Sequence, residues 1–385
     1  MRLGVYTDYT YHRDSAGVSG ERAFVRFMTG LRPLVARLVL IGRLDPTPGR
    51  SHYPLEPGVE FLGLPYYTSL TRRPIKAIVS LGRSAVRFWR LLDELDTVWL
   101  LGPYIHTIGF ALIALVRRRT VVLGVRQDFP IYARSRHPGA RWIHLAADIL
   151  EWSFRALARR LPVVVVGPDL ARNYRRSRAL LQLTVSLISE SDLVPADLAL
   201  ARPRTTRVLS VGRLDTEKNP LLLADVLAAL HVHDSSWQMD IAGDGPLQEA
   251  LTDRLKTLEL QDAAELHGYV PIDQELPALY RAADVFLHVS FTEGLPQVLF
   301  EAFAAGTPVV ATAVGGVPNA AADAAILIPP DDAQAAASAI EHVHSDPELR
   351  ARLVRSGYER ARGHTLEGQA KRLVEFLQSA ATGGH

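Results

Sequence analysis

The side chains best suited to bind a ligand are two glutamates, Glu293 and Glu301, with seven residues between them. Apolar segments at 283–289 and 307–312 flank this stretch and predict the order strand, loop, helix, strand. One carboxylate then lies in the loop and one in the helix, where both can accept hydrogen bonds from sugar hydroxyls. The first helical turn, with its free N–H groups and positive dipole end, favours a phosphate. The combination fits a sugar attached to a nucleoside diphosphate.

A pair of cations follows the apolar segment 208–211. Arg213 and Lys218 stand five positions apart in a loop, where arginine binds phosphate oxygens through its fork and lysine acts as a point charge. Together they would stabilise the negative charge that grows on a nucleoside diphosphate leaving group. This loop alone is equally well explained by exposed surface cations, but the nearby glutamate pair favours the ligand interpretation.

Two further turns follow predicted strands. The glycine-rich turn at 243–246 is a weak signal by itself, because its glycines can serve only to permit positive φ. The stretch 267–271 ends the next strand, and its backbone N–H and C=O groups can face a nucleotide base.

Size and composition indicate two globular domains of ordinary size, since the chain has 385 residues, 48% hydrophobic and 22% charged. The absence of cysteine excludes disulfides, thiolate metal sites and cysteine nucleophiles, and it is compatible with a cytoplasmic location without establishing one. The first residues lead directly into a strand and lack the apolar core of a signal peptide. The apolar window 98–116 contains a Gly-Pro pair and His106, which predicts a buried strand, a turn and a core helix rather than a membrane span.

Charge is divided unevenly between the two halves of the chain. Residues 1–200 carry 28 Lys and Arg against 16 Asp and Glu, whereas residues 201–385 carry 15 against 25. The balances of +12 and −10 suggest an anionic partner for the first half. We expect no nucleic-acid partner.

Short apolar runs alternate with helical patterns throughout, which predicts a parallel α/β architecture. The pattern weakens around 190–207, where we place a linker between domains at 1–195 and 205–365. Ligands of open parallel sheets bind beyond the carboxyl ends of the strands, so the motifs that follow strands matter most. The predicted strands are 2–6, 37–41, 59–63, 97–101, 120–125, 162–166, 207–211, 238–242, 264–268, 285–289, 308–311 and 325–328.

On these motifs, residues 205–365 resemble the donor-binding half of a retaining glycosyltransferase of family 4. The resemblance implies the GT-B fold, in which two Rossmann-like domains face each other across a cleft. It rests on the order and spacing of five features, which are Gly212-Arg213-Leu214 with Glu217-Lys218-Asn219, the turn 243–246, Gly268-Tyr269-Val270, the glutamate pair and Gly315-Gly316-Val317-Pro318.

The resemblance also implies roles for individual residues. Arg213 and Lys218 would hold the donor diphosphate, Glu301 the ribose hydroxyls and Glu293 the hydroxyls of the donor sugar. The proton of the acceptor would pass to the leaving phosphate in a front-face substitution without a metal, and the sequence has no Asp-x-Asp motif where a metal-dependent enzyme would need one. Further donor contacts would come from Gly243, Tyr269 and Val270, and from the backbone of Gly294, Leu295, Pro296, Gln297 and Val298.

The first half matches the family less well. Gly20 stands where the family has glycines opening the first helix, and its amide would face the donor phosphate. Gln127 replaces a histidine that the family often has, and a glutamine can bind a sugar hydroxyl but cannot act as an imidazole base. Asp128 remains a catalytic candidate. His106 is a further acceptor-side candidate, although a lone histidine on an apolar helix is also typical of a structural role.

A basic segment at 72–90 combines six cations with apolar residues at helical spacing. It fits either an anionic membrane surface or a core-packing helix with a solvated arginine face. In this fold the terminal helix, predicted at 366–380, packs back onto the first domain. Further cations that favour the membrane interpretation are Arg155, Arg159, Arg160, Arg172, Arg175, Arg176 and Arg178.

The sequence thus predicts a metal-independent, retaining glycosyltransferase without a cofactor, which moves a hexose-type sugar from a UDP- or GDP-linked donor to a hydroxyl acceptor. A lipid-linked or cell-envelope glycan is the acceptor we expect, and a peripheral position at the inner face of the plasma membrane is the alternative to a purely cytoplasmic one. Two other interpretations stay open. One is a non-catalytic nucleotide-sugar-binding partner subunit, favoured by Gln127, and the other is a GT-B epimerase or phosphorylase. The sequence does not identify the base, the sugar or the acceptor.

Overall fold

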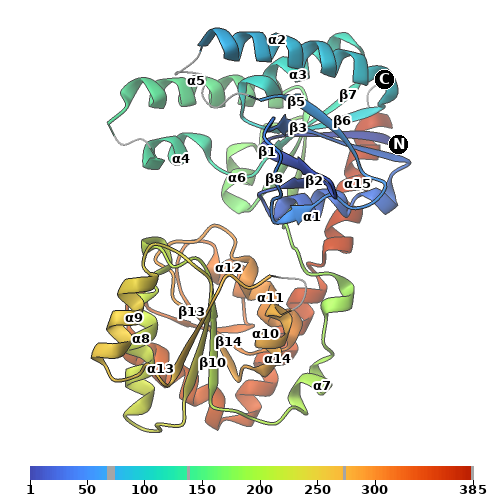
Figure 1. The fold of residues 1–385 in the computed structure, drawn as a ribbon. Coiled ribbons are helices and arrows are strands. Elements are labelled where there is room, and N and C mark those ends of the chain that lie inside the picture. The colour runs from blue at the N-terminus through green and yellow to red at the C-terminus, as the bar shows by residue number, and fades with distance from the viewer. Residues whose placement is uncertain (67–73, 137–138, 272–274, 383–385) are drawn as a thin grey trace. The chain divides into compact units, whose positions relative to one another are not determined.

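The computed structural model describes residues 1–66, 74–136, 139–271 and 275–382, which form two α/β units (Figure 1). Unit 1 comprises Met1–Leu187 and Leu366–His385, and unit 2 comprises Ile188–Thr365. The division falls before the predicted domain boundary at 195, because the segment after 188 packs on unit 2. Ile188 belongs to the unit 2 core, and the amide of Val194 donates to the carbonyl of Ala304 at 2.8 Å.

Unit 2 is built on a six-stranded parallel sheet in the order β12-β11-β10-β13-β14-β15. All six predicted strands of the second half are confirmed to within one residue at either end. They are easily predicted because strands buried on both faces are continuous apolar runs. Their bounds are β10 (Arg207–Val211), β11 (Gln238–Ala242), β12 (Ala264–Gly268), β13 (Val285–His288), β14 (Val309–Thr312) and β15 (Ala325–Ile328).

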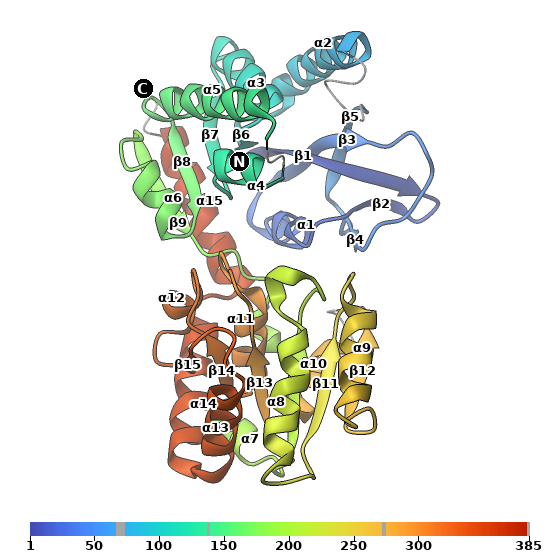
Figure 2. The same cartoon turned by 90° about the vertical axis from the view of Figure 1, so that its left-hand side faces the viewer.

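Helices cover both faces of this sheet (Figures 1 and 2). Successive residues of a strand point to opposite faces, so Val208 packs into one core and Leu209 into the other. One face carries α8 (Leu221–His231), α9 (Gln248–Thr257) and α13 (Ala333–Ser345), and the other carries α10 (Leu276–Ala282), α11 (Gln297–Ala305) and α14 (Pro347–Arg362). The short helices α7 (Ala196–Leu200) and α12 (Val317–Ala321) complete the unit.

Unit 1 is built on a nine-stranded sheet in which a parallel core carries antiparallel strands at one side. The path runs β4-β2-β1-β6-β7-β8-β9, and β3 joins β1 to β5. The strands are β1 (Arg2–Asp14), β2 (Gly17–Gly20), β3 (Arg37–Leu44), β4 (Tyr53–Pro54), β5 (Glu60–Pro65), β6 (Thr97–Gly102), β7 (Thr120–Val125), β8 (Pro162–Val166) and β9 (Ala179–Leu183).

The first strand differs most from its prediction. The sequence predicts a strand at 2–6, whereas β1 continues to Asp14. The pairing of β1 with β3 shifts between Tyr6 and Thr10, and beyond this bulge β1 forms a hairpin with β2. The extension was missed because residues 7–12 are mostly polar and lack the alternation of a half-buried strand. Asp8 and Tyr9 lie within this bulge, a kind of irregularity that bends a strand and changes the direction of its side chains.

Helices cover the unit 1 sheet as well (Figure 2). On one face lie α2 (Pro74–Leu91), α3 (Ile105–Val116) and α5 (Arg141–Ala158), while α4 (Phe129–Arg136) packs on α5 and α6 (Pro168–Asn173) on β8 and β9. The terminal helix α15 (Leu366–Thr382) contacts β7 and β9 and buries Leu373 and Leu377. The other short elements are α1 (Phe24–Thr29), the 3₁₀ turn η1 (Arg32–Leu34) and the 3₁₀ turn η2 (Leu92–Glu94).

The apolar window 98–116 forms β6, a turn and α3, which confirms the predicted strand, turn and helix. Among the described residues, no helix combines the length and the apolar character needed to pass through a bilayer.

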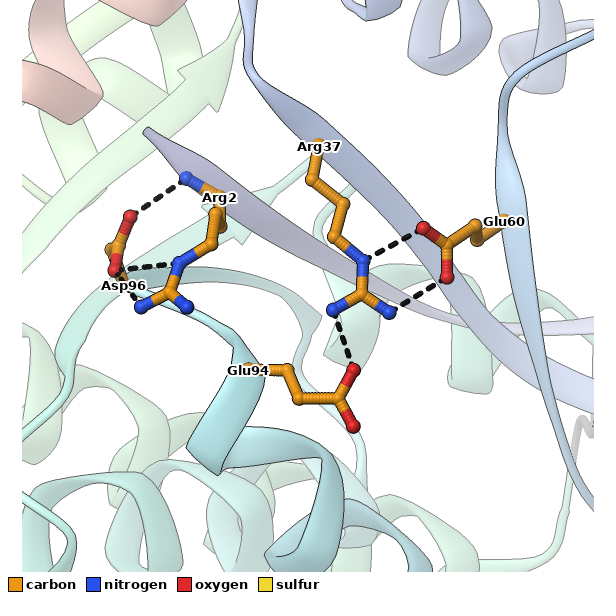
Figure 3. A network of polar contacts seen from close by, with 5 residues as sticks. All are labelled: Arg2, Arg37, Glu60, Glu94 and Asp96. Atoms are coloured by element: carbon orange, nitrogen blue, oxygen red, sulfur yellow. Dashed lines mark hydrogen bonds and ion pairs between the residues drawn. The ribbon is translucent and has the colours of Figure 1, made fainter.

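Ion pairs join the strands of unit 1 at the amino edge of its sheet, which is the edge away from the strand ends that could bind a ligand (Figure 3). Arg37 donates to both carboxylate oxygens of Glu60 at 2.7 Å and to Glu94 at 2.5 Å. The Arg37 guanidinium thereby lowers the pKa of Glu60. Arg2 makes an equivalent contact with Asp96 at 2.6 Å. These pairs tie the first residues of β1, β3 and β5 to the segment that precedes β6.

Replacing Arg37 by methionine should lower the free energy of unfolding of unit 1 by about 0.5–1 kcal/mol at low salt, because two half-exposed carboxylates lose a shared cation. Urea unfolding at low and at high salt measures this, and the difference should shrink at high salt. Arg83→Met, which removes an exposed arginine from α2, is the matched control. An equal loss in both variants, or a loss that salt does not reduce, contradicts the assignment.

Candidate functional site

The strand order of unit 2 reverses between β10 and β13, since the strands numbered upward from β10 run to one side and those from β13 to the other. Ligands of open α/β sheets bind at such a switch point, beyond the carboxyl ends of the strands. The loop after β10 carries Arg213 and Lys218, and the loop after β13 carries Glu293. Adjacent strands therefore bring the predicted cations and the predicted carboxylate to the same edge.

Main-chain hydrogen bonds join the loops along this edge. The loop after β10 bonds to the loops after β11 and β13, and the loop after β14 bonds to that after β13. Because these bonds use backbone groups, the loops hold one another in place without a ligand. The bonds run from Gly212 N to Ala242 O (3.0 Å), Leu214 N to Asp244 O (2.7 Å), Gly243 N to Gly268 O (2.7 Å), Phe291 N to Glu217 O (2.9 Å) and Gly316 N to Glu293 O (3.0 Å).

Two glycines allow this close approach. A Cβ atom on Gly243 would lie 1.8 Å from the carbonyl oxygen of Gly212, and one on Gly316 would lie 1.7 Å from that of Gly294. Gly243 also has a φ of +142°, which other residues rarely adopt. The packing of the loops thus explains why the turn at 243–246, a weak signal in the sequence, contains glycine.

Glu293 is the centre of the charge cluster at this edge. Its side chain is 8% exposed, and its Oε1 atom forms an ion pair with Nζ of Lys218. The same oxygen lies 2.9 Å from Nε2 of His288 and accepts a hydrogen bond from Oγ of Ser290 at 2.8 Å. All these contacts involve Oε1, so that within the described part of the chain Oε2 has no partner.

The electrostatics keep Glu293 ionised. Burial by itself would raise the pKa of Glu293, but the contact with His288 and the charge of Lys218 outweigh it and lower the pKa to about 2. At neutral pH the group is therefore a hydrogen-bond acceptor and a poor proton acceptor. The sequence analysis missed His288 and Ser290. Their position at the end of a predicted strand, directly before a predicted site loop, could have identified them as site residues.

Arg213 lies at the same edge but does not contact Glu293. Its side chain is 67% exposed, with Nη1 2.7 Å from Asp215 and Nη2 3.5 Å from Glu217. Lys218 and Arg213 nevertheless line the same small hollow above β10 and β13, together with Gly212, His288 and Ser290. The exposed guanidinium can exchange its carboxylate partners for a ligand anion.

Glu301 lies in the second turn of α11, where the phenol of Tyr280 donates to it at 2.9 Å. Tyr280 is buried, and burial together with the charge of Glu301 raises the pKa of Tyr280 well above its ordinary value. The phenol thus remains a donor that orients the carboxylate. Tyr280 is a third residue that was not predicted from the sequence, because it lies on a different helix and has no motif of its own.

The remaining donor-side candidates lie around these groups. Gly294 and Leu295 are in the loop before α11, and Pro296 is the N-cap residue rather than a member of the first turn. Gln297 and Val298 open the helix. After β12, Tyr269 is 48% exposed, while Val270 packs against the core of unit 2.

In unit 1, Asp128 acts as a helix cap. Its Oδ1 accepts a hydrogen bond from the amide of Ile131 at 3.1 Å at the start of α4, and Oδ2 accepts one from Asn173 at 3.4 Å. Gln127, next to it, is exposed. The aspartate predicted to be catalytic therefore caps the start of α4 in this structure.

The other two unit 1 candidates are buried. His106, in the first turn of α3, has Nδ1 3.9 Å from Asp8. Burial, followed by the charge of Arg43, lowers the pKa of His106 to about 4, so the imidazole is neutral at neutral pH. Gly20 lies on β2, opposite Tyr11, and α1 begins only at Phe24. The prediction that Gly20 opens this helix is therefore wrong. A hairpin intervenes between the first strand and the helix.

One group of side chains has the composition of a metal site. Ligand atoms of Asp240, Glu265 and His267 lie within 4.8 Å of one another on β11 and β12. However, Arg207 donates to both oxygens of Asp240, at 3.0 and 2.8 Å, and so supplies the positive charge that a cation would bring. The expectation of a metal-independent protein remains a prediction.

Residues 200–360 match the family model of the glycosyl transferases group 1. Among curated relatives, a D-inositol 3-phosphate glycosyltransferase of Corynebacterium urealyticum is 34% identical over 195 residues, covering 48% of this chain and 46% of that protein. A mannosylfructose-phosphate synthase of Agrobacterium fabrum is 32% identical over 182 residues, covering 44% of this chain and 40% of that protein. The chain thus spans about half the length of the curated relatives it matches.

Solved structures share the fold along the whole chain. Sucrose-phosphate synthase from Thermosynechococcus elongatus has a TM-score of 0.69 at 18% identity, with 100% of both chains covered. Anabaena HepE in complex with UDP-glucose has a TM-score of 0.65 at 17% identity, with 98% of this chain and 100% of that chain covered. The predicted resemblance to a GT-B glycosyltransferase is confirmed, and family 4 is consistent with these findings.

Gly316→Ala should lower the free energy of unfolding of unit 2 by about 1–3 kcal/mol, because the new methyl group has to displace the backbone of the Glu293 loop. Chemical denaturation followed by fluorescence and circular dichroism measures the loss. Gly82→Ala is the control, since an added Cβ there meets nothing within 4 Å and the site lies on α2. Equal stability of Gly316→Ala and the unaltered protein contradicts the account of loop packing.

Proposed function

We propose that this chain is a retaining hexosyltransferase that moves a sugar from a UDP- or GDP-linked donor to a hydroxyl acceptor. The observation that carries the proposal is the Glu293 carboxylate, which Lys218, His288 and Ser290 hold ionised at the switch point of unit 2. Oε2 of Glu293 provides the free acceptor that a donor-sugar hydroxyl requires. The relatives range from a D-inositol 3-phosphate glycosyltransferase to a putative colanic acid biosynthesis glycosyltransferase, so they support sugar transfer without selecting one acceptor.

The donor fits the charges of this edge. Lys218 and the exposed guanidinium of Arg213 would bind the diphosphate, with the amide groups at the start of α11 beside them. Glu301, oriented by Tyr280, would accept hydrogen bonds from the ribose, and Tyr269 is exposed where the base would lie. Some compared structures contain UDP or UDP-glucose, which supports a nucleotide-sugar donor.

The protonation states of the candidate residues support a retaining mechanism. Glu293, with its low pKa, does not accept a proton at neutral pH, and Asp128 uses its carboxylate as a helix cap. We therefore assign the base to the substrate. The bond between the anomeric carbon and the phosphate oxygen breaks, and the acceptor oxygen attacks from the same face. Its proton passes to an oxygen of the leaving diphosphate. Lys218 and Arg213 stabilise the charge of that leaving group, so the proposed step needs no metal.

Replacing Lys218 or Arg213 by methionine should each lower kcat by about 10²–10³-fold, the usual loss when one stabilising contact to a developing anion is removed. Glu293→Gln should also lower transfer, because it removes the charged acceptor for the sugar hydroxyl and leaves Lys218 without its ion-pair partner. Transfer and slow donor hydrolysis would be measured with UDP- and GDP-sugars, with and without EDTA, and the product anomer determined by NMR. Lys256→Met is the control, because Lys256 pairs with Asp253 on exposed α9.

The outcomes separate the competing functions. Normal turnover in all three variants overturns the site assignment. Nucleotide-sugar binding without turnover, even with acceptor extracts, favours the non-catalytic partner subunit. A changed sugar in the recovered donor indicates an epimerase, and phosphate-dependent release of sugar phosphate indicates a phosphorylase. Loss of activity with EDTA excludes the metal-independent mechanism.

We further propose that unit 1 associates with an anionic membrane surface. On α5, Trp142, Leu145, Ile149 and Trp152 share one helix face, and the two tryptophans are 59% and 72% exposed. Exposed Leu112 and Val116 add apolar surface on α3. Exposed Val79, Val86 and Trp89 add more on α2, the helix for which membrane contact is one of the two interpretations of the sequence. A cavity of about 510 Å³ at the end of α5 is lined by Arg155, Arg159, Arg172, Arg175 and Arg176. Aromatic anchors beside arginines are typical of interfacial binding.

The double variant Trp142→Ser, Trp152→Ser should bind vesicles of phosphatidylglycerol at least ten-fold more weakly, because each indole buries a large apolar area in the interface. Co-sedimentation with anionic and with zwitterionic vesicles measures the change. The control is Leu198→Ser, Val232→Ser, which removes two exposed apolar side chains from unit 2. Equal binding to both vesicle types, or an equal loss in the control, contradicts the proposal.

A further inference from the structure

Arg126, the residue that follows β7, is a cation without a carboxylate partner. Its Nε atom is buried and has no hydrogen-bond partner, and Nη1 donates to the phenol of Tyr9. The guanidinium lies over the ring of Phe24 at 3.7 Å from its centroid. Among the residues that the structure describes, no aspartate or glutamate forms an ion pair with it.

The charged residues near Arg126 do not neutralise its positive charge. Asp8, the nearby carboxylate of the β1 bulge, lies 3.2 Å from Nε of Arg43 and is thus already engaged. Arg22 is close enough that its positive charge opposes that of Arg126. Burial, the largest cause, and Arg22 lower the pKa of Arg126, yet a guanidinium stays charged at neutral pH. The cluster therefore carries a net positive charge.

A buried charge without a counter-ion is unfavourable, because desolvation is not offset by a partner. A phenol and an aromatic face offset only part of this cost. Such an arrangement is explained when a ligand supplies the missing charge. Arg126 is only partly buried as a residue, so a ligand can reach the edge of the guanidinium that Tyr9 does not occupy.

The position of Arg126 specifies which ligand is concerned. It lies at the carboxyl edge of the unit 1 sheet, beside the exposed Gln127 and next to Tyr9 at the bulge of β1. Ligands of such sheets bind at this edge. In unit 2, Lys218 and Arg213 already provide cations for a diphosphate, so the donor does not require this group.

We propose that Arg126 is an anion-binding residue of the acceptor site and that the acceptor carries a phosphate or carboxylate group. The assignment of the ligand as the acceptor rests on the proposed function. The anion site itself rests on unit 1 alone. Tyr9 and Phe24 position the guanidinium, and the anion completes the charge balance.

Thermal unfolding of the full chain with inorganic phosphate tests the anion site without any transfer reaction. In buffer without multivalent anions, Arg126→Met should raise the Tm by about 2–4 °C, because it removes an uncompensated charge while keeping apolar volume over Phe24. Phosphate should stabilise the unaltered protein more than Arg126→Met, whose remaining response comes from the phosphate-binding cations proposed in unit 2. Acetate in a parallel titration distinguishes a carboxylate site from a phosphate site.

Arg117→Met is the matched control. Arg117 also lies over an aromatic ring, that of Trp89 at 4.6 Å, but it forms an ion pair with Asp93. This variant should not gain stability, and it should retain the full response to phosphate. A drop in Tm for Arg126→Met, or a phosphate response as large as that of the unaltered protein, overturns the anion site.

A second titration distinguishes the two sources of anion. UDP and GDP report on the donor site of unit 2, and they should stabilise Arg126→Met and Arg117→Met to the same extent. Loss of the nucleotide response in Arg126→Met alone would mean that Arg126 binds the donor phosphate, which overturns the acceptor assignment. With transfer assays, Arg126→Met should raise KM for phosphorylated acceptors at least ten-fold, and Arg126→Lys should restore part of the loss. If no transfer is found while the phosphate response depends on Arg126, the proposed function fails and the anion site stands.

Discussion

The ion pair between Lys218 and Glu293 is the constraint on which the site of unit 2 depends. It joins the loops after β10 and β13, which lie side by side only because the sheet reverses its order at this point. A buried carboxylate without a cation would become protonated or would draw in water, and either change would remove the acceptor that a sugar hydroxyl needs. The cation therefore stabilises the protein and prepares the site for a ligand.

Each unit contains a buried charge, and the two units differ in whether the chain supplies the opposite charge. In unit 2 the buried carboxylate has its cation within the chain, and its second oxygen remains available to a neutral hydroxyl. In unit 1 the cation Arg126 has no carboxylate partner within the described ranges, and Asp8 forms an ion pair with Arg43. A site whose charges are balanced favours neutral ligand groups that form hydrogen bonds, whereas a site with an unbalanced charge favours a ligand group of opposite charge. This difference agrees with the basic first half and the acidic second half of the chain.

How far the sequence could predict this structure depends on the range of the interactions. Parallel buried strands are apolar runs, so the strands of unit 2 could be placed closely, and a glutamate pair around Pro296 is a local motif. The extension of β1 and the partners His288 and Tyr280 could not be predicted, because they depend on pairing between distant segments. Asp128 carries a local signal that could have been used, while its catalytic role stays a prediction. An aspartate two residues before a proline is a helix-start signal, and its capping role was readable in the sequence.

The glycines of unit 2 bear on how the donor site could work. Loops whose backbones approach so closely that no Cβ fits between them cannot move independently, because a shift of one would break the hydrogen bonds of the next. Lys218 and Glu293 are attached to these loops and are thus preorganised, which reduces the reorganisation needed when charge develops on a leaving group. Arg213 is the exception, since it is exposed and pairs with acidic residues of its own loop. At the proposed donor site, a fixed pair beside one adaptable arginine would adjust to the diphosphate while keeping the geometry at the sugar unchanged.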